Sequence, residues 1–206
     1  YRYHKFMKAI FIGTVQLSYV LLETLIQKDV EIIGVITSKN NKFNSDYADL
    51  SGVCKKNKIP ILYTKNINSD KVTKWIKNKS PDIMFCFGWS QIIRDKVLKI
   101  PKEGVIGYHP AMLPKNRGRH PLIWALANGQ NSTGSTFFKM NSGTDTGDIV
   151  SQKKIKIYKY DDASSLYKKM QKLAKVQIST IINKINTNKL TQRKQKNKNS
   201  NYLRKR

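Results

Sequence analysis

The stretch that decides the fold runs from Gly104 to Asp148 and reads GVIGYHPAMLPKNRGRHPLIWALANGQNSTGSTFFKMNSGTDTGD. A short apolar run leads into His109, and Pro110 then removes a backbone donor, so a strand should end there. Asp145 lies in a glycine-flanked turn, where the chain can bring a carboxylate back to that strand end. Open α/β sheets place ligand chemistry at the carboxyl ends of their strands. His109 and Asp145 are therefore the first candidates for a functional site.

The rest of the sequence alternates between strand patterns and helix patterns. Apolar and β-branched runs predict strands at residues 9–12, 32–36, 59–61, 82–87, 135–140 and 149–157, and one more strand beginning at Val105. Helical spacing of apolar residues predicts helices at 16–27, 44–55, 70–79, 95–98, 122–128 and 162–184. This alternation predicts an α/β fold with a mostly parallel, doubly wound sheet, whose last two strands are antiparallel.

The composition is strongly basic. The 206 residues, enough for one domain with a proper core, include 39 Lys and Arg against 13 Asp and Glu, a formal net charge of +26. Such an excess attracts polyanions, whether nucleic acid, anionic membrane or phosphorylated small molecules. Because Lys, Asn and Ile are abundant throughout the chain, we favour a general compositional bias over a dedicated polyanion-binding surface.

The two ends of the chain differ from its middle. Residues 185–206 contain no acidic residue and are rich in Asn, Lys, Gln and Ser. Such a segment should be flexible, or ordered only by contacts outside its own sequence. We expect one domain at 7–184 and a basic polar tail at 185–206, and we exclude residues 1–6 from the fold.

Cysteine usage and hydropathy favour an intracellular protein. Cys54 and Cys86 are too few for a disulfide framework or a metal site. We recognise no secretory signal and no spanning stretch, so we expect a cytoplasmic location and no membrane partner. The loop Gly13-Thr14-Val15-Gln16 follows the first expected strand but lacks the second and third glycines of a dinucleotide fingerprint, so we expect no NAD.

The spacing of five residues resembles a known family. His109, Leu113, Pro114, Asp145 and Gly147 match the pattern of formyltransferases that use 10-formyltetrahydrofolate, and the resemblance runs from about Lys8 to Leu166. That family includes methionyl-tRNA, glycinamide ribonucleotide and sugar N-formyltransferases. The segments around His109 and Arg117 are most similar to the sugar formyltransferases of the pseudaminic acid pathway. Residues 200–206 resemble the start of the family's carboxyl-terminal part, which indicates that the chain is cut short there.

The resemblance implies a Rossmann-like domain with helices on both sheet faces, and it implies roles for particular residues. His109 and Asp145 would be catalytic, with no metal. The donor would contact one loop through Trp89, Ser90, Gln91, Ile92 and Ile93, and an opposing wall formed by Met140, Asn141, Ser142 and Gly143. The substrate would contact Thr14 and Gln16. Lys115 and Arg117, which with Arg119 surround a glycine before a helix start, form an arrangement that suits anions and are further candidates to contact it. Plain structural roles remain open: a tight turn at 13–16, core packing for Trp89 and Met140, and a solvated loop for Lys115 and Arg117.

By the same resemblance, the chain would move a formyl group from 10-formyltetrahydrofolate to the amine of a nucleotide-linked amino-deoxy sugar, in bacterial surface glycan biosynthesis. Its partner would be that small-molecule substrate, with nucleic acid not expected and a homodimer left open. One alternative is a methionyl-tRNA formyltransferase. An alternative from another class is a basic nucleic-acid-binding module without catalysis.

The chain departs from the family at Gly107. In the family an Asn side chain at this position donates a hydrogen bond to the formyl oxygen as it becomes an oxyanion, and glycine has no side chain to do so. Three groups could replace that donor: a protonated His109, a backbone amide near Ser90, or His120. We favour a protonated His109 supported by Asp145.

Overall fold

The computed structural model describes residues 7–39 and 45–205. The chain divides into two compact units at the junction of Ile106 and Gly107, and each unit is described by itself. The strands follow the order β3-β2-β1-β4-β5-β7-β8, and β5 (Val105–His109) runs across the division. The prediction of a mostly parallel α/β sheet is confirmed by this order and by the pairings given below.

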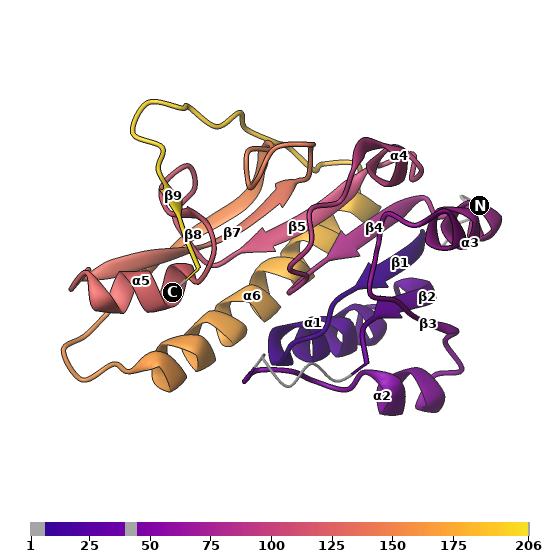
Figure 1. Cartoon of the computed structure of the whole chain (residues 1–206), viewed down its shortest axis with the longest axis horizontal. Coiled ribbons are helices and arrows are strands. Elements are labelled where there is room, and N and C mark those ends of the chain that lie inside the picture. Colours follow the sequence, from indigo (N-terminus) through magenta and orange to yellow (C-terminus); the bar gives the residue numbers. More distant parts are fainter. Residues whose placement is uncertain (1–6, 40–44, 206) are drawn as a thin grey trace. The chain divides into compact units, whose positions relative to one another are not determined.

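The first unit is a parallel sheet with helical connections (Figure 1). Its strands are β1 (Lys8–Ile12), β2 (Glu31–Thr37), β3 (Ile61–Tyr63) and β4 (Ile83–Cys86), and β1 pairs in parallel with both β2 and β4. Its helices are α1 (Gln16–Gln27), α2 (Ser51–Lys56), α3 (Asp70–Lys79) and α4 (Asp95–Leu98). All four residues of β4 are buried, as in a parallel sheet that is covered on both faces.

The second unit contains an antiparallel strand pair and a long helix. β7 (Ser132–Lys139) pairs antiparallel with β8 (Ile149–Lys156), as predicted, and α6 (Ala163–Asn186) follows. The Asp162 carboxylate accepts the backbone N–H of Ser165 at 2.7 Å and so caps the first turn of α6. The short helix α5 (Pro121–Ala127) begins with a proline at its first position, where the missing N–H costs nothing. One apolar core joins α5, β8 and α6 through residues that include Leu122, Ile155, Leu166 and Met170.

Two of the predicted element positions are wrong. The helix expected at 44–55 begins only at Ser51, because Tyr47 bridges to Val15 and the Ala48 N–H donates to the Thr14 carbonyl at 2.9 Å. Those backbone groups are therefore used outside a helix, while Asn44 lies outside the described residues. The strand expected at 59–61 lies at Ile61–Tyr63, where it pairs in parallel with β2.

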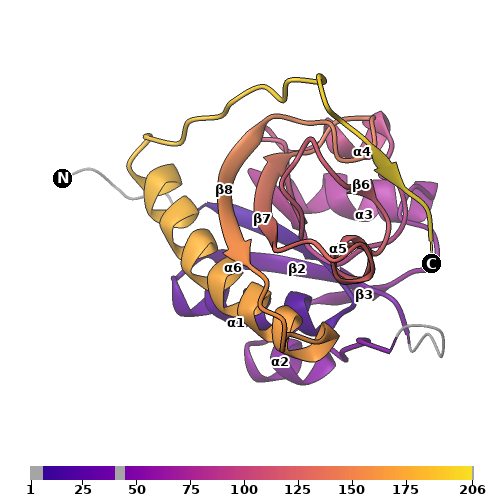
Figure 2. The same ribbon diagram turned by 90° about the vertical axis from the view of Figure 1, so that its left-hand side faces the viewer.

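The polar tail is ordered by contacts with the rest of the second unit. Arg193 forms an antiparallel bridge with Ile149, and β9 (Tyr202–Leu203) pairs in parallel with β6 (Arg117–Gly118). Figure 2 shows the tail, in yellow, leaving the end of α6 and passing along β8 and β7 toward β6. Its own sequence has few apolar residues, so its order depends on these partners, the second of the two alternatives given above.

Within the described residues, no helix is both long enough and apolar enough to cross a membrane.

Candidate active site

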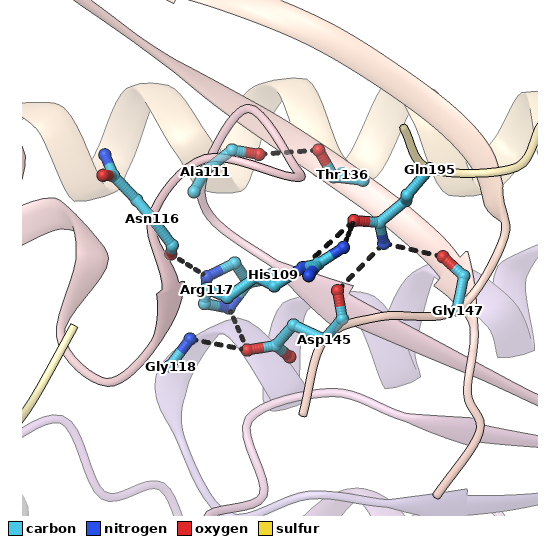
Figure 3. Close-up of polar contacts among 9 residues, drawn as sticks. All are labelled: His109, Ala111, Asn116, Arg117, Gly118, Thr136, Asp145, Gly147 and Gln195. Atoms are coloured by element: carbon cyan, nitrogen blue, oxygen red, sulfur yellow. Dashed lines mark hydrogen bonds and ion pairs between the residues drawn. The ribbon is translucent and has the colours of Figure 1, made fainter. Parts of the chain in front are cut away.

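His109 is the last residue of β5 and its side chain is buried, with 7% of its surface exposed. The ring Nε2 lies 2.7 Å from the backbone carbonyl oxygen of Asn116 (Figure 3). A carbonyl oxygen can only accept a hydrogen bond, so Nε2 must carry a proton in this arrangement. Nδ1 is consequently the ring atom that can gain or lose a proton.

Asp145 faces that second ring nitrogen. Its Oδ2 lies 3.6 Å from His109 Nδ1, close enough for charge attraction but longer than a hydrogen bond. The same oxygen accepts the backbone N–H of Gly118 at 2.8 Å, which fixes the carboxylate. The chain therefore holds a buried imidazole and a carboxylate opposite each other, at a distance too long for a direct hydrogen bond. This spacing leaves Nδ1 available to a third group.

The turn that carries Asp145 has a demanding backbone. Asp145 itself has a positive φ of 53°, a conformation that aspartate tolerates better than most residues. At Gly147, an added Cβ would lie 1.5 Å from the backbone oxygen of Lys139, so only glycine fits there. Asn141 Oδ1 closes the turn by accepting from the Gly143 N–H at 3.1 Å and from the Thr146 hydroxyl at 2.7 Å. Asn141, Ser142 and Gly143 are exposed.

Gly107, where the family has asparagine, is occupied in a different way. A Cβ at this position would lie 2.8 Å from Met140 Cγ and 3.1 Å from Phe138 Cζ. Met140 also packs against the cluster formed by Leu113, Phe138 and Ile149. Met140 thus fills the space beside Gly107, and its thioether offers no hydrogen-bond donor to a formyl oxygen.

Arg117 and Lys115, both predicted to contact substrate, have opposite environments. Lys115 is exposed, whereas Arg117 is 2% exposed. The Arg117 guanidinium donates four hydrogen bonds to the side chains of Gln195, Asn197 and Tyr202. These donors are used within the protein, so in this structure Arg117 does not present its charge to a phosphate. The reason is the tail, which covers the guanidinium.

Gln195 was not predicted as a site residue. Its Nε2 donates to the backbone oxygens of Asp145 and Gly147 at 2.9 and 2.7 Å, while its Oε1 accepts from Arg117. It lies in a segment whose sequence is dominated by Asn, Lys and Gln, so no pattern singles it out. Its separation from Asp145 by 50 positions also removes any local signal.

In the first unit, the strand-end loop at residues 13–16 is built mainly for structure. The Thr14 side chain is buried and its hydroxyl donates to the Gly88 backbone oxygen at 3.1 Å, while Ser18 Oγ accepts the Thr14 N–H. At Gly13, an added Cβ would lie 2.5 Å from both the Phe87 backbone oxygen and Ser18 Oγ. Gln16 is exposed and free to meet a ligand, unlike Thr14.

The loop at residues 88–93 is braced to a neighbouring loop of the same unit. Asn68 Nδ2 donates to the Ile92 backbone oxygen at 2.8 Å, and Gln91 Nε2 donates to the Lys65 backbone oxygen. Ile93 is buried, whereas Ser90, Gln91 and Ile92 are exposed, Ile92 to 62%. Trp89 is half-buried, and its indole Nε1 is shielded from solvent with no hydrogen-bond partner among the described residues. A buried donor without a partner is costly, so this loop is suited to a ligand that offers an acceptor.

The described part of the chain contains no group of three or more His, Cys, Asp or Glu residues that could hold a metal ion. Within the second unit, the site is therefore described by its histidine, its carboxylate and the backbone groups of residues 116–118 that contact them.

Comparison with known proteins identifies the family. A family model described as Formyl transferase matches residues 7–182, so the chain belongs to this family. The resemblance seen in the motif around His109 and Asp145 is confirmed.

Individual relatives include more than one kind of formyltransferase. The chain is 37% identical over 166 residues to the bifunctional polymyxin resistance protein ArnA of Wigglesworthia glossinidia brevipalpis, covering 80% of this chain and 25% of that protein. It is 27% identical over 200 residues to the methionyl-tRNA formyltransferase of Thermotoga maritima, covering 95% of this chain and 64% of that protein. The chain thus spans less than two thirds of the length of either relative.

Among solved structures, WlaRD has the same fold. It is described as a sugar 3N-formyl transferase in the presence of dTDP and 5-N-formyl-THF, and it superposes with a TM-score of 0.74 at 25% identity. The match covers 96% of this chain and 69% of that one.

Proposed function

We propose that the protein transfers a formyl group from 10-formyltetrahydrofolate to the primary amine of a nucleotide-linked amino-deoxy sugar. The observation that supports this most strongly is the His109–Asp145 pair, held 3.6 Å apart at the end of β5 in a chain of the Formyl transferase family. An amine and an activated formyl group need one group to stabilise an oxyanion and one to remove a proton, and the pair supplies both.

The formyl donor suits the loop at residues 88–93. Its Trp89 indole N–H has no partner in the part of the chain that the structure describes, and its Ile92 side chain is exposed to 62%, so the loop offers both a donor and an apolar surface to a heteroaromatic ring. Gly88 has a positive φ of 72° and a Cβ there would lie 2.2 Å from Val15 Cγ2, which keeps the loop tight at its start. The contribution of Met140, Asn141, Ser142 and Gly143 stays a prediction.

In the mechanism, the amine nitrogen attacks the formyl carbon, and the carbonyl electron pair moves onto the formyl oxygen. His109, with Nε2–H held by the Asn116 carbonyl, donates from its protonated Nδ1 to that oxyanion. Asp145, fixed by the Gly118 N–H, accepts the proton that the attacking amine loses. When the tetrahedral intermediate collapses, the bond from the formyl carbon to the folate nitrogen breaks, that nitrogen takes up the proton held by Asp145, and the new amide is released.

The acceptor is proposed from the relatives and from the exposure of two residues that were predicted to contact it. WlaRD is a sugar formyltransferase in the presence of dTDP, and it aligns with 96% of this chain. Lys115 and Gln16 are exposed and remain candidates to contact a nucleotide sugar, whereas Arg117 is covered by the tail.

A methionyl-tRNA acceptor is the second candidate, supported by the alignment of 95% of this chain with the Thermotoga maritima enzyme.

An acceptor panel tests this proposal. Wild-type protein is given 10-formyltetrahydrofolate with three acceptors in parallel: amino-sugar nucleotides carrying the amine at position 3 or 4, glycinamide ribonucleotide, and methionyl-tRNA. We expect kcat/KM to be highest for an amino-sugar nucleotide, and a preference for methionyl-tRNA would replace the sugar with the second candidate. The control is Lys172→Glu, an exposed change on α6 remote in sequence from the predicted site residues, which should leave the order of acceptors unchanged.

A further inference from the structure

We propose that Gln195 is a positioning residue for Asp145, acting through a hydrogen-bonded bridge anchored on the buried Arg117. The proposal rests on the formyl-transfer function above and adds to it a residue of the polar tail. Figure 3 shows Gln195 approaching the Asp145 turn from the side opposite Gly118.

The bridge joins two segments that both touch the catalytic pair. Arg117 directly follows Asn116, whose carbonyl holds His109 Nε2, and directly precedes Gly118, whose N–H holds Asp145. Gln195 Oε1 accepts from Arg117 Nη2 at 2.7 Å and from Nε at 3.3 Å. A shift of Arg117 therefore moves both backbone groups that orient the pair.

The other end of the same amide holds the Asp145 turn. Gln195 Nε2 donates to the Asp145 and Gly147 backbone oxygens at 2.9 and 2.7 Å. The positive φ of Asp145 makes this turn a strained piece of backbone that needs support from neighbours. An amide side chain is suited to the position because it accepts on one side and donates on the other.

Residues of the tail other than Gln195 also fix the position of Arg117. Its guanidinium also donates to Asn197 Oδ1 at 3.1 Å and to the Tyr202 hydroxyl at 3.2 Å, and it lies 5.6 Å from the centre of the Tyr202 ring. The backbones pair as well, Arg117 with Tyr202 and Gly118 with Leu203, where β6 and β9 run in parallel. The approach is close, because an added Cβ at Gly118 would lie 2.4 Å from the Leu203 backbone oxygen. The polar tail is therefore packed against the loop that follows His109, at the place where an error in geometry would reach the reacting groups.

The test uses two changes at Gln195. Gln195→Glu keeps an acceptor for Arg117 but turns an oxygen toward two carbonyl oxygens, so it should push the Asp145 turn away. Gln195→Met keeps the approximate volume and removes both functions. We expect kcat to fall about tenfold or more in each variant while the KM for the formyl donor stays within about twofold, since a displacement of about 1 Å can cost up to 10²-fold. The control is Gln171→Glu on α6, which makes the same charge change in the same unit and should leave kcat unchanged.

Two further measurements separate positioning from simple folding. Thermal unfolding should show that each Gln195 variant is folded at the assay temperature. Arg117→Lys, which keeps the charge but not the fork of donors, should combine with Gln195→Met without further loss in kcat, because both changes break the same bridge.

A readout without turnover keeps this inference apart from the proposed function. The chain has three histidines, so the ring nitrogen signals of His109 and His120 can be followed by NMR. We expect the His109 signals to move in both Gln195 variants and the His120 signals to stay. Moved signals in a protein that formylates no acceptor would remove the proposed function and leave the positioning role. Unmoved His109 signals, or a kcat loss no larger than the unfolded fraction explains, would overturn the role of Gln195.

Discussion

Tyr108 and His109 are neighbours on β5, and successive side chains on a strand point to opposite faces. On one face, the Tyr108 hydroxyl lies 2.9 Å from Ser135 Oγ, which donates to Gln177 Oε1 at 2.6 Å, while Gln177 Nε2 donates to Ser151 Oγ at 2.9 Å. On the other face, His109 Nδ1 and Asp145 Oδ2 lie 3.6 Å apart. Each side chain is hydrogen-bonded to a backbone group of the loop at 116–118. In the first network, which we call the closed network, each of these side chains is hydrogen-bonded to the next. In the second, His109 Nδ1 has Asp145 only at 3.6 Å, beyond hydrogen-bond distance.

This difference suggests how to separate polar groups that only support the fold from those proposed to act in formyl transfer. Buried polar groups are normally hydrogen-bonded, and the chain from Tyr108 to Ser151 meets that rule by direct contacts between side chains. The histidine and the carboxylate are also largely buried, with 7% and 18% of their side chains exposed, but they are held at a distance that favours an interaction with a third group. Burial alone would not distinguish the two faces of β5.

Among the substitutions that test this comparison, we expect the largest loss of turnover from a change at His109. His109→Ala removes the proposed donor to the oxyanion, and we expect turnover to fall by about 10²–10⁴, with a much smaller change in the melting temperature. His120→Ala is the comparison variant, because His120 is the rival candidate for this donor, and we expect it to lose much less turnover than His109→Ala. Steady-state formyl transfer by the two variants checks this, and near wild-type turnover in His109→Ala would contradict the proposed mechanism.

The next effect is at Gly107. Gly107→Asn restores the family residue but places a Cβ 2.8 Å from Met140 Cγ and 3.1 Å from Phe138 Cζ, so we expect the free energy of unfolding to fall by about 1–3 kcal/mol and no gain in turnover. Denaturant unfolding measures the stability change. Met140→Ala in the same chain should recover part of it.

Gly52→Asn is the control for this change, since a Cβ at Gly52 meets nothing within 4 Å among residues 7–39 and 45–205. A large gain in turnover from Gly107→Asn would show that the wild-type site is a degenerate family member, and the proposed function would then fail.

The face of β5 that carries Tyr108 predicts a loss of stability at alkaline pH. Burial raises the pKa of the Tyr108 hydroxyl above its ordinary value of 10.0. The folded state therefore keeps this proton where the unfolded state loses it, so stability is fully present below about pH 10 and falls as the pH rises from there toward the folded pKa. One such group contributes a slope of about 1.4 kcal/mol per pH unit.

Tyr108→Phe should make that alkaline slope shallower, as measured by unfolding between about pH 9 and 11. Burial also raises the pKa of the Cys54 thiol to about 11, so part of the slope should remain in the variant. An unchanged slope would show that the Tyr108 hydroxyl is not held as described.

The smallest expected effect is that of Tyr108→Phe at neutral pH. The change removes one hydrogen bond to Ser135 and leaves the Ser135–Gln177 bonds in place, so we expect a loss of about 1 kcal/mol in stability. Turnover should stay within about twofold of wild type, because the hydroxyl belongs to the closed network. A loss of turnover comparable to that of His109→Ala would remove the distinction between the two faces.

The sequence predicted one part of this arrangement and missed another, for physical reasons. His109 and Asp145 could be found because Pro110 ends a strand and the glycines around Asp145 permit a turn, both of which are local signals. The mostly parallel character of the sheet follows from the same kind of local signal, the alternation between strands and helices, whereas the order of the strands was not predicted. The burial of Arg117 could not be found, because a cation beside a glycine has the same local pattern whether it is free or covered.

Gln195 shows the same limit more strongly. It is 78 positions from Arg117 and lies in a run of polar residues that predicts no structure of its own. Its role depends on the pairing of β9 with β6, which is a long-range property of two two-residue strands. Short strands without apolar alternation leave no period for sequence reasoning to detect.

The most direct test of the account follows a labelled carbon. Wild-type protein is supplied with 10-formyltetrahydrofolate carrying ¹³C in the formyl group, together with an amino-sugar nucleotide, and the products are examined by NMR. The account predicts that the label appears in the amide on the sugar, in equal amount to the tetrahydrofolate released, and that His109→Ala slows its appearance by about 10²–10⁴. Label that stays on the folate, or that appears on methionyl-tRNA in preference to the sugar when both are present, would contradict it.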